Sequence, residues 1–380
     1  MQNILILSFS TIHSDPRVMR QINLLAERYS LTVVGFGSKP DASVEYIDVS
    51  ATRADLFTRL LWGIKLLFGF FESYYWSRSQ VNSVLAKLDG RVFDLCVAND
   101  ISALPLVLRL AKGRPVLMDA HEYSPREFDE KLLWRMLFGR YYHYLCRRYL
   151  PQVAAMVTVC QGIAEAYAQH YNVSPSVVHN APLDQRLLPS ATQSEKVRLV
   201  HHGAAIRSRH LETMIDVMKY LDCRFTLDFM LVENDISYMN DLRLRAKGDD
   251  RIRFIPAVPM TDICNTINAY DVGIYLLPPV NFNHEYALPN KFFEYIQARL
   301  AVAIGPSPEM SRFVEQYSFG VVADSFEPIA LAAALSSISL EDLQRYKQAA
   351  DTAAKSINYE TGGRVLLGEI NRLLGSGELT

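Results

Sequence analysis

Residues 272–277 read VGIYLL, a run of apolar and β-favouring residues that predicts a buried strand. The run ends at Pro278 and Pro279, and after a loop the stretch 289–295, PNKFFEY, opens an amphipathic helix that continues through Ala298. Strand, loop and helix in this order make one βα unit, the repeat from which parallel sheets are built. The segment therefore predicts an α/β fold.

The same alternation runs through both halves of the 380-residue chain, whose length favours two domains. Strands are expected at 4–7, 31–34, 93–97 and 115–118, and then at 199–201, 225–231, 252–255, 272–276, 301–304 and 321–322. The polar stretch 190–196 has the composition of a linker. We predict two doubly wound, Rossmann-like domains that face each other across a cleft, at 1–185 and 196–356. A C-terminal helix at about 357–375 is expected to pack back on the first domain.

Composition excludes several classes of protein. Hydrophobic residues make up 49% of the chain and charged residues 21%, which is typical of a globular protein. The formal net charge of -2 provides no overall field for a polyanion, and we find no nucleic-acid module. The five cysteines show no metal-ligand spacing, and the N-terminus has no basic region before its first apolar strand. A cytoplasmic protein with reduced core thiols is predicted.

The helix that begins near Pro289 has the features of a phosphate site. Proline suits the first turn, and the amides of Asn290, Lys291 and Phe292 can point at an anion. Lys291 adds a positive charge, and Glu294, one turn further on, can accept hydrogen bonds from a ribose diol. The alternative is an ordinary helix N-terminus with a solvated lysine and glutamate.

This region resembles the retaining glycosyltransferases of family four, whose C-terminal domain carries a stretch like PNKxFEY. The resemblance continues through the small-residue segment 301–310, and it implies the GT-B fold. Family members often have two glutamates separated by seven residues, the second binding ribose and the first the donor sugar. Glu294 matches the second. The first position falls on Tyr286, and Glu285 stands one place too early.

A second family element is a glycine after a strand, followed by a basic residue that grips the donor diphosphate. Residues 201–212, HHGAAIRSRHLE, match it through Gly203 and Arg209, with Arg207 as the fallback. With Lys291, Arg209 would stabilise the leaving nucleoside diphosphate without a metal or a cofactor. The base is expected to meet main chain around Val258.

The stretch 119–123, DAHEY, directly follows a predicted strand and resembles a DAHE-like family sequence. By this resemblance His121 is a catalytic residue near the donor sugar and its phosphate, whereas a lone histidine would otherwise be interpreted as capping a strand end. Glu122 and the pair Asn99 and Asp100, which follows another strand, are expected to line the acceptor side.

The loop 14–17, SDPR, resembles the DPRV-type loop of some family members. Arg17 is a candidate ligand for an acceptor phosphate. Asp15 either contacts the acceptor or caps the following helix.

Two aromatic segments of the N-terminal half, 60–76 and 131–148, hold all three tryptophans, and the second has no acidic residue. Both are typical of helices that lie on an anionic membrane surface. A hairpin packed into the core or a contact between two copies explains them equally well. The first segment is too interrupted to predict a transmembrane span.

The resemblance implies transfer of a sugar, with retention, from a UDP- or GDP-sugar to a glycan acceptor. The membrane-like segments favour a polyprenyl-diphosphate-linked saccharide, built for a surface polysaccharide at the inner face of the plasma membrane, and a soluble glycan is the alternative. A nucleotide-sugar 2-epimerase shares the scaffold but needs acid and base carboxylates, which the sequence does not locate. A catalytically silent glycan-binding scaffold is the third interpretation.

Overall fold

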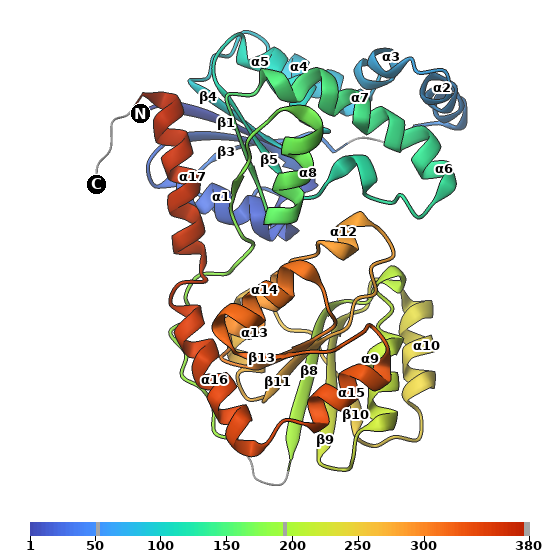
Figure 1. The fold of residues 1–380 in the computed structure, drawn as a ribbon. Coiled ribbons are helices and arrows are strands. Elements are labelled where there is room, and N and C mark those ends of the chain that lie inside the picture. The colour runs from blue at the N-terminus through green and yellow to red at the C-terminus, as the bar shows by residue number, and fades with distance from the viewer. Residues whose placement is uncertain (51–53, 193–195, 376–380) are drawn as a thin grey trace. The chain divides into compact units, whose positions relative to one another are not determined.

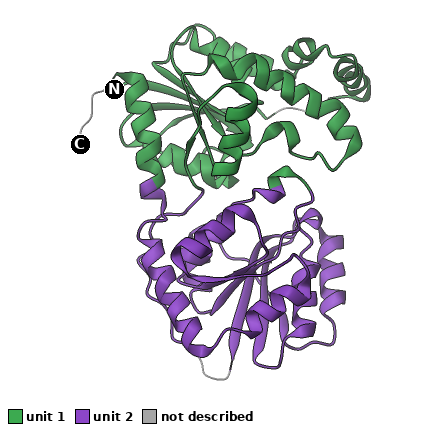
Figure 2. Cartoon of the chain, in the orientation of Figure 1, with its two compact units in different colours: residues 1–179, 281–283, 362–380 green, residues 180–280, 284–361 purple. Residues whose placement is uncertain are grey.

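The computed structural model describes residues 1–50, 54–192 and 196–375 (Figure 1). Residues 193–195 of the predicted linker lie outside the described residues. The chain divides into two compact units (Figure 2). Unit 1 comprises Met1–His179, Asn281–Asn283 and Gly362–Thr380, and unit 2 comprises Asn180–Val280 and His284–Thr361.

Unit 1 is built on a seven-stranded parallel sheet in the order β3-β2-β1-β4-β5-β6-β7. Its strands are β1 (Asn3–Thr11), β2 (Ser30–Phe36), β3 (Glu45–Asp48), β4 (Leu95–Asn99), β5 (Val116–Ala120), β6 (Ala155–Thr158) and β7 (Ser176–Val177). The central strands β4 and β5 are buried along their whole length, which explains why they read as unbroken apolar runs.

Helices cover both faces of this sheet (Figure 1). They are α1 (Pro16–Ala26), α2 (Leu56–Leu67), α3 (Phe71–Trp76), α4 (Ser79–Lys87), α5 (Leu104–Ala111), α6 (Leu132–Trp134), α7 (Arg140–Tyr149) and α8 (Gln161–Tyr171). Short 3-10 turns lie at Ile12–Ser14, Ser124–Arg126 and Leu150–Gln152, and a π-helical turn, η3, lies at Arg135–Gly139.

The C-terminal helix α17 (Tyr359–Leu374) completes the core of unit 1. Leu366 and Ile370 are buried in one apolar cluster with Ile4 and Ile6 of β1 and Val18 of α1. Outside the cluster, the Tyr29 hydroxyl donates to Asn371 Oδ1 at 2.7 Å. The last helix in sequence thus packs in the same core as the first strand.

Unit 2 has a six-stranded parallel sheet in the order β10-β9-β8-β11-β12-β13. Its strands are β8 (Val197–Ala204), β9 (Phe225–Val232), β10 (Ile252–Ile255), β11 (Val272–Tyr275), β12 (Ala301–Ile304) and β13 (Gly320–Val322). Numbered from β8, this is the Rossmann order 3-2-1-4-5-6, which reverses between β8 and β11. Unit 1 reverses in the same way between β1 and β4.

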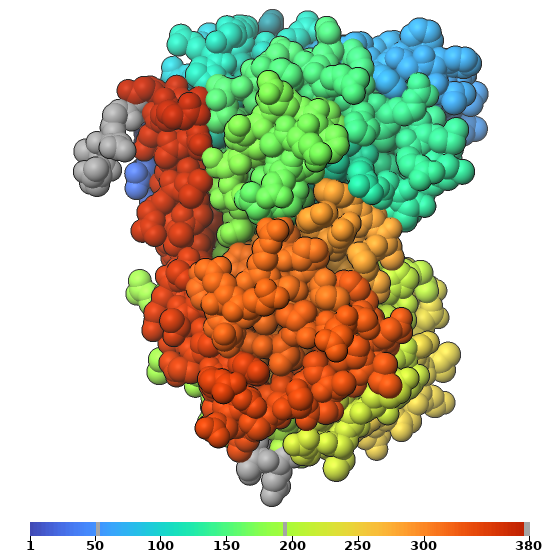
Figure 3. All heavy atoms as spheres, in the orientation of Figure 1, coloured from blue at the N-terminus to red at the C-terminus, as the bar shows by residue number. Residues whose placement is uncertain are grey.

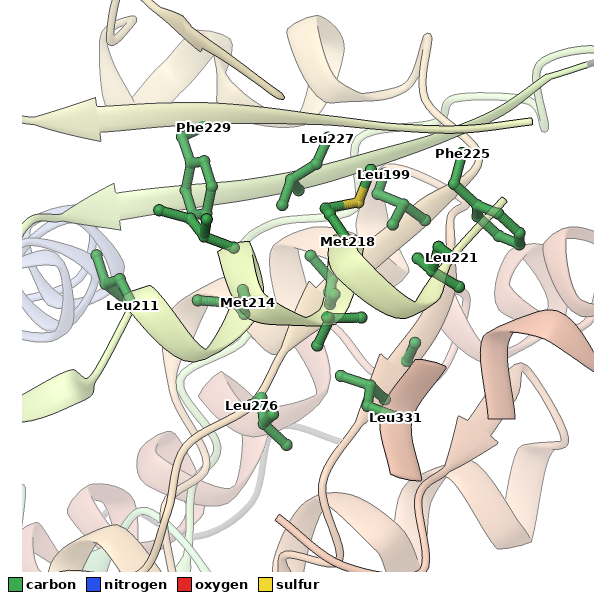
Figure 4. Packing of buried hydrophobic residues seen from close by; sticks show 14 of the residues in the cluster. Leu199, Leu211, Met214, Met218, Leu221, Phe225, Leu227, Phe229, Leu276 and Leu331 are labelled. Carbon is green, nitrogen blue, oxygen red and sulfur yellow. The ribbon is translucent and has the colours of Figure 1, made fainter. Parts of the chain in front are cut away.

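The helices of unit 2 are α9 (Glu212–Val217), α10 (Ile236–Ala246), α11 (Ile263–Ile267), α13 (Asn290–Gln297), α14 (Pro308–Tyr317), α15 (Pro328–Ser336) and α16 (Leu340–Ala354). Short 3-10 turns lie at Arg207–Arg209, Met218–Tyr220 and Met260–Asp262, and α12 (Phe282–Glu285) contains residues of both units. Leucine, methionine and phenylalanine side chains of β8, β9 and α9 interlock in its core (Figure 4).

The predicted fold class is confirmed: both units are parallel, doubly wound α/β structures. Strands β3, β6 and β7 were not predicted from the sequence. Among the five free cysteines, Cys223 is exposed, so the prediction of core thiols is wrong at that position.

Candidate functional site

The first candidate site lies in unit 2, at the strands where the sheet order reverses. Gly203 stands near the end of β8 with φ of +119°, a backbone conformation that glycine adopts readily and other residues rarely adopt. A Cβ atom there would lie 3.2 Å from Nζ of Lys291, in the first turn of α13. The end of β8 and the start of α13 therefore meet at the carboxyl edge, where ligands bind in such sheets.

The Lys291 side chain is buried, with only 5% of the residue exposed. Its Nζ lies 3.1 Å from Nε2 of His201 and 4.8 Å from the ring centre of Tyr275. Nδ1 of His201 lies 3.0 Å from the carbonyl oxygen of Ile274, an atom that only accepts. Nδ1 therefore carries the hydrogen of the neutral ring, and Nε2 accepts a hydrogen bond from Lys291.

This environment disfavours positive charge on both partners. Burial lowers the pKa of Lys291 well below its usual range, and the nearby Arg209 lowers it further while Glu294 opposes the shift. Burial, followed by the charge of Lys291, likewise lowers the pKa of His201. No acidic side chain among the described residues forms an ion pair with Lys291. The amine therefore lacks the negative charge that a bound phosphate would supply.

The two candidate arginines of this region differ in their partners. Arg207 Nη2 lies 2.7 Å from Asp241 Oδ2, and its guanidinium lies over the ring of Tyr238 at 4.8 Å. Arg209 is half-buried, and within the described part of the chain no carboxylate pairs with it. Arg209 is thus the better placed cation for an incoming anion, while Arg207 is already neutralised.

Helix α13 begins as predicted, with Pro289 as its N-cap residue. The amide of Phe292 donates to the carbonyl of Pro289 at 3.0 Å, so one of the three amides expected to face an anion already has a partner. The Phe292 ring is buried against Phe313 and Phe319, so its side chain packs in the core and is not exposed to a donor. The expectation that Phe292 binds the donor is therefore corrected. The corresponding expectation for Asn290 and Lys291 stays a prediction.

Glu294 lies beside a second buried histidine. His202 Nε2 is 3.4 Å from Glu294 Oε2, and the glutamate side chain is 15% exposed. Burial, with the charge of Lys291, lowers the pKa of His202 to about 3, so the histidine is neutral at physiological pH. The carboxyl oxygens of Glu294 can accept hydrogen bonds from ligand hydroxyls.

A cavity of about 450 Å³ opens at the carboxyl ends of β9 and β10. Its lining includes Ile255, Pro256 and Ala257, within the segment expected to meet the nucleotide base. Val258 itself is half-buried and is not among the lining residues. Gly203 pairs with Leu231 of β9, another residue of the lining, so the cavity is one strand away from the phosphate position.

Tyr286, which the family resemblance aligns with the first glutamate, precedes α13 and is half-buried. Glu285 is exposed.

The second candidate site lies in unit 1 and is organised by a buried ion pair. Arg17 donates to both oxygens of Asp119, with Nη2 2.6 Å from Oδ1, and its Nη1 donates to the carbonyl of Val178 at 2.7 Å. Both side chains are less than 10% exposed. Arg17 is therefore engaged inside unit 1, which corrects its expected role as a ligand for an acceptor phosphate. Asp15 caps α1 by accepting from the amide of Val18 at 3.2 Å.

A chain of hydrogen bonds leads from this ion pair to His121. Gln21 Nε2 donates to Asp119 at 3.2 Å, and Asn99 Nδ2 donates to Gln21 Oε1 at 3.0 Å. Asn99 Oδ1 is thereby left to accept from Nε2 of His121 at 3.1 Å. The network fixes the His121 ring and assigns a hydrogen to its Nε2.

Asp100 holds the other side of His121. Its backbone has φ of +64°, and its Oδ1 accepts from the amide of His121 at 2.9 Å. Oδ2 lies 3.5 Å from Nδ1 of the same ring. Burial raises the pKa of Asp100, and the neighbouring His121 opposes this shift. The Asp100 carboxyl lies beside His121 at a position open to a ligand, since 37% of its side chain is exposed.

These groups line a cavity of about 270 Å³ at the carboxyl ends of β4 and β5. Its walls are Asp100, Ile101, Ser102, His121, Glu122, Ser124, Glu127 and Tyr142. Burial, reinforced by Glu122 and Asp100, raises the pKa of Glu127 to about 8. At neutral pH Glu127 is therefore mostly protonated and can donate a hydrogen bond into the cavity.

The sequence of unit 1 carries a recognisable family pattern. Residues 17–181 match the family described as Glycosyltransferase Family 4. This match confirms the resemblance to family four glycosyltransferases that the sequence motifs indicated. No curated protein is similar enough in sequence to match this chain.

Solved structures with the same fold extend the likeness to both units of the chain. HepE of Anabaena in complex with UDP and glucose superposes with a TM-score of 0.71 at 15% identity, over 98% of this chain and 100% of that one. Sucrose-phosphate synthase of Thermosynechococcus elongatus gives 0.72 at 13% identity, over 100% of both chains. The UDP-forming α,α-trehalose-phosphate synthase of Burkholderia vietnamiensis gives 0.70 at 10%, over 99% and 100%. The chain has the GT-B fold of these neighbours.

Within unit 1, the structure brings together four of the predicted residues, Asn99, Asp100, His121 and Glu122. It adds Glu127, which no sequence motif indicated because it lies past the end of the DAHEY stretch. In unit 2 it adds His201 and His202, which stand inside the stretch that aligned with the family glycine motif. The sequence signal that could have indicated them is the pair of adjacent histidines directly before Gly203.

No group of three or more His, Cys, Asp and Glu side chains among the described residues is arranged to hold a metal ion. No helix in residues 1–50, 54–192 and 196–375 is long and apolar enough to cross a membrane.

Proposed function

We propose that this glycosyltransferase moves a sugar, with retention at the anomeric carbon, from a nucleoside-diphosphate sugar to a hydroxyl of a glycan acceptor. The observation that carries the proposal is the buried Lys291 beside Gly203, close to the unneutralised Arg209. Two cations without acidic partners at the carboxyl edge of a Rossmann sheet suit a diphosphate.

Different residues of unit 2 bind the diphosphate, the ribose and the base of the donor. Lys291, Arg209 and the first amides of α13 bind the diphosphate and stabilise the charge that develops on it as the glycosidic bond breaks. Glu294 accepts hydrogen bonds from the ribose hydroxyls, and the cavity beside Pro256 and Ala257 accommodates the base. These groups act without a metal or another cofactor. UDP is the first nucleotide to test, because HepE of Anabaena was solved with UDP.

Retention without a protein nucleophile implies that the leaving diphosphate takes the proton of the acceptor hydroxyl on the same face of the sugar. The bond from the anomeric carbon to the diphosphate oxygen breaks, the bond to the acceptor oxygen forms, and the proton ends on the diphosphate. The family resemblance assigns His121 a catalytic role in this step. Its ring is fixed by Asn99 and Asp100, so its orientation is set before substrate binds.

The acceptor is proposed to be a polyprenyl-diphosphate-linked saccharide used for a surface polysaccharide, reached at the cytoplasmic face of a membrane. The acceptor cavity of unit 1 has carboxyl groups on Asp100, Glu122 and Glu127 and no lysine or arginine in its lining. Such a lining suits the hydroxyl groups of a neutral sugar better than a phosphate or a carboxylate.

The same cavity favours one second candidate, a nucleotide-sugar 2-epimerase. That reaction needs groups to remove and return a proton on carbon, and Glu127 with a raised pKa of about 8 beside Asp100 is such a group. The family 4 match favours the transferase.

One incubation separates the two candidates. The purified protein is mixed with UDP-glucose, UDP-N-acetylglucosamine and the corresponding GDP-sugars, without acceptor, and the products are followed by NMR. A transferase releases nucleoside diphosphate and free sugar slowly, and this release is lost in Lys291→Ala. An epimerase returns an epimerised nucleotide sugar. The absence of any product, together with no thermal stabilisation by nucleoside diphosphates, would contradict both.

A further inference from the structure

One face of α2 is apolar and exposed to solvent. Six side chains at helical spacing, Leu56, Phe57, Leu60, Ile64, Leu67 and Phe68, are each between 43% and 81% exposed. The opposite face holds the helix in place, because Leu66 is buried and Trp62 packs edge-on against Tyr74 at 5.9 Å. Helices that are apolar on all sides are normally covered on all sides.

A neighbouring turn extends this surface. Leu132 and Leu133 of α6 are 61% and 69% exposed, and Met136 of the following turn η3 is 49% exposed. This turn contacts α2, and Arg140 Nη1 lies 3.5 Å from the carbonyl of Leu67. The two segments lie side by side at one end of unit 1 (Figure 1) and form a continuous outer surface in the space-filling view (Figure 3). We call the exposed face of α2 and this turn the apolar platform.

The apolar platform does not result from incomplete packing of the side chains beneath it. The aromatic side chains behind it, on α3 and α7, are already packed, with Phe71 5.8 Å from Tyr141 and Tyr74 5.1 Å from Tyr141 between ring centres. Glu72, the acid nearest to them, accepts hydrogen bonds from the Trp76 indole and from two tyrosine hydroxyls. The structure thus separates the two aromatic segments into a packed layer and an exposed one. Contiguous exposed apolar patches rimmed by polar residues mark interaction sites.

Basic side chains outnumber acidic ones around the platform. Arg59, Lys131, Arg135, Arg140 and Arg147 are exposed on the two segments, whereas the exposed acids are Asp55, the N-cap of α2, and Glu130, whose Oε1 lies 4.0 Å from Lys131 Nζ. A second copy of the chain docking by the same face would bring these like charges together, which opposes self-association. Anionic lipid headgroups neutralise them while the acyl chains cover the leucine and phenylalanine side chains.

We propose that the apolar platform binds an anionic lipid bilayer, with α2 lying in the interface and its exposed leucine and phenylalanine side chains among the acyl chains. This interaction is distinct from sugar transfer and does not depend on the donor or the acceptor.

Sedimentation with vesicles tests the proposal. The full-length protein is mixed with vesicles of phosphatidylcholine alone, or of phosphatidylcholine with phosphatidylglycerol, and pelleted. We expect binding to the anionic vesicles that weakens as salt is raised. Leu60→Gln with Ile64→Gln should lower partitioning by roughly tenfold or more because apolar contact is lost, and Arg135→Glu with Arg140→Glu by a similar factor.

A matched control uses two exposed apolar residues of unit 2. Ile236 and Leu244 on α10 are 69% and 71% exposed, and Ile236→Gln with Leu244→Gln should bind vesicles like the wild type. Retained thermal stabilisation by UDP shows that each variant is folded. The proposal is overturned if the wild type stays in the supernatant with anionic vesicles, or if the platform variant binds as well as the control. A concentration-dependent dimer that the Leu60 and Ile64 substitutions dissociate, without vesicle binding, would instead assign the platform to a second copy.

Discussion

Nζ of Lys291 lies 3.1 Å from Nε2 of His201, with both side chains buried and the histidine tautomer fixed by the carbonyl of Ile274. Burial disfavours the charged form of Lys291 in the free protein, and a diphosphate bound beside it would favour that form. Lys291→Ala should weaken binding of the preferred nucleoside diphosphate by roughly 10- to 100-fold, the range for a hydrogen bond to a charged group. Calorimetry measures the effect. The corresponding nucleoside, which lacks phosphates, should bind both proteins equally.

Binding of the diphosphate should take up a proton. Burial lowers the pKa of Lys291 in the free protein, and the bound phosphates favour its charged form. Affinity is therefore fully present below the pKa of the free lysine and falls as pH rises through it. Calorimetry at about pH 8, well above the phosphate pKa of about 6, in buffers of different ionisation enthalpy, reports the uptake. Lys291→Arg should abolish it because arginine stays charged. Equal uptake by that variant would rule out the lysine as the source.

Arg209 and Arg207 form a matched pair two residues apart. Arg209→Ala should weaken diphosphate binding by roughly 10- to 100-fold because a charge-assisted contact is lost. Arg207→Ala should change it little, because that guanidinium is neutralised by Asp241 at 2.7 Å. The reverse order of effects would show that the family alignment assigns the wrong arginine.

Gly203 offers a test of close packing against Lys291. Gly203→Ala forces a Cβ to within 3.2 Å of Nζ at a φ of +119°. We expect a loss of stability of about 1–3 kcal/mol from backbone strain, together with weaker diphosphate binding. Gly248→Ala is the control, since its φ of +94° imposes similar strain with nothing within 4 Å of the added carbon. It should lose stability and keep its affinity.

The buried pair of Arg17 and Asp119 should matter for folding. Arg17→Ala leaves the carboxylate buried without its main partner, which costs about 3–5 kcal/mol. Denaturant unfolding measures the loss. Arg224→Ala removes an exposed partner of Asp222 and should leave the midpoint nearly unchanged. If Arg17→Ala unfolds at the wild-type midpoint but fails to bind acceptor, Arg17 is a ligand as first predicted.

The architecture could be predicted because its central strands are buried on both faces and therefore read as apolar runs. Edge strand β3 was not predicted, since Glu45 and Asp48 at its ends are exposed and break the pattern. Strand β7 has only two residues.

The local motifs gave the positions of Lys291, Arg209 and Glu294, but not their surroundings. Burial of Lys291 depends on His201, which is 90 residues away in sequence. The role of Arg17 depends on Asp119, which is 102 residues away in sequence. The loop sequence alone therefore predicted a guanidinium open to a ligand, whereas the fold buries it. Glu127 acquires its raised pKa from neighbours that only the folded chain assembles.

Helix α17 returns to unit 1 from the far end of the chain, where Leu366 and Ile370 fill the core beside β1. Unit 1 is therefore not encoded by one continuous stretch of the gene. A hybrid made with one junction near residue 180 would combine the first strands of one parent with the last helix of the other. Exchanging unit 1 between relatives thus requires a second junction near residue 362, so that the sheet and the helix packed against it are inherited together.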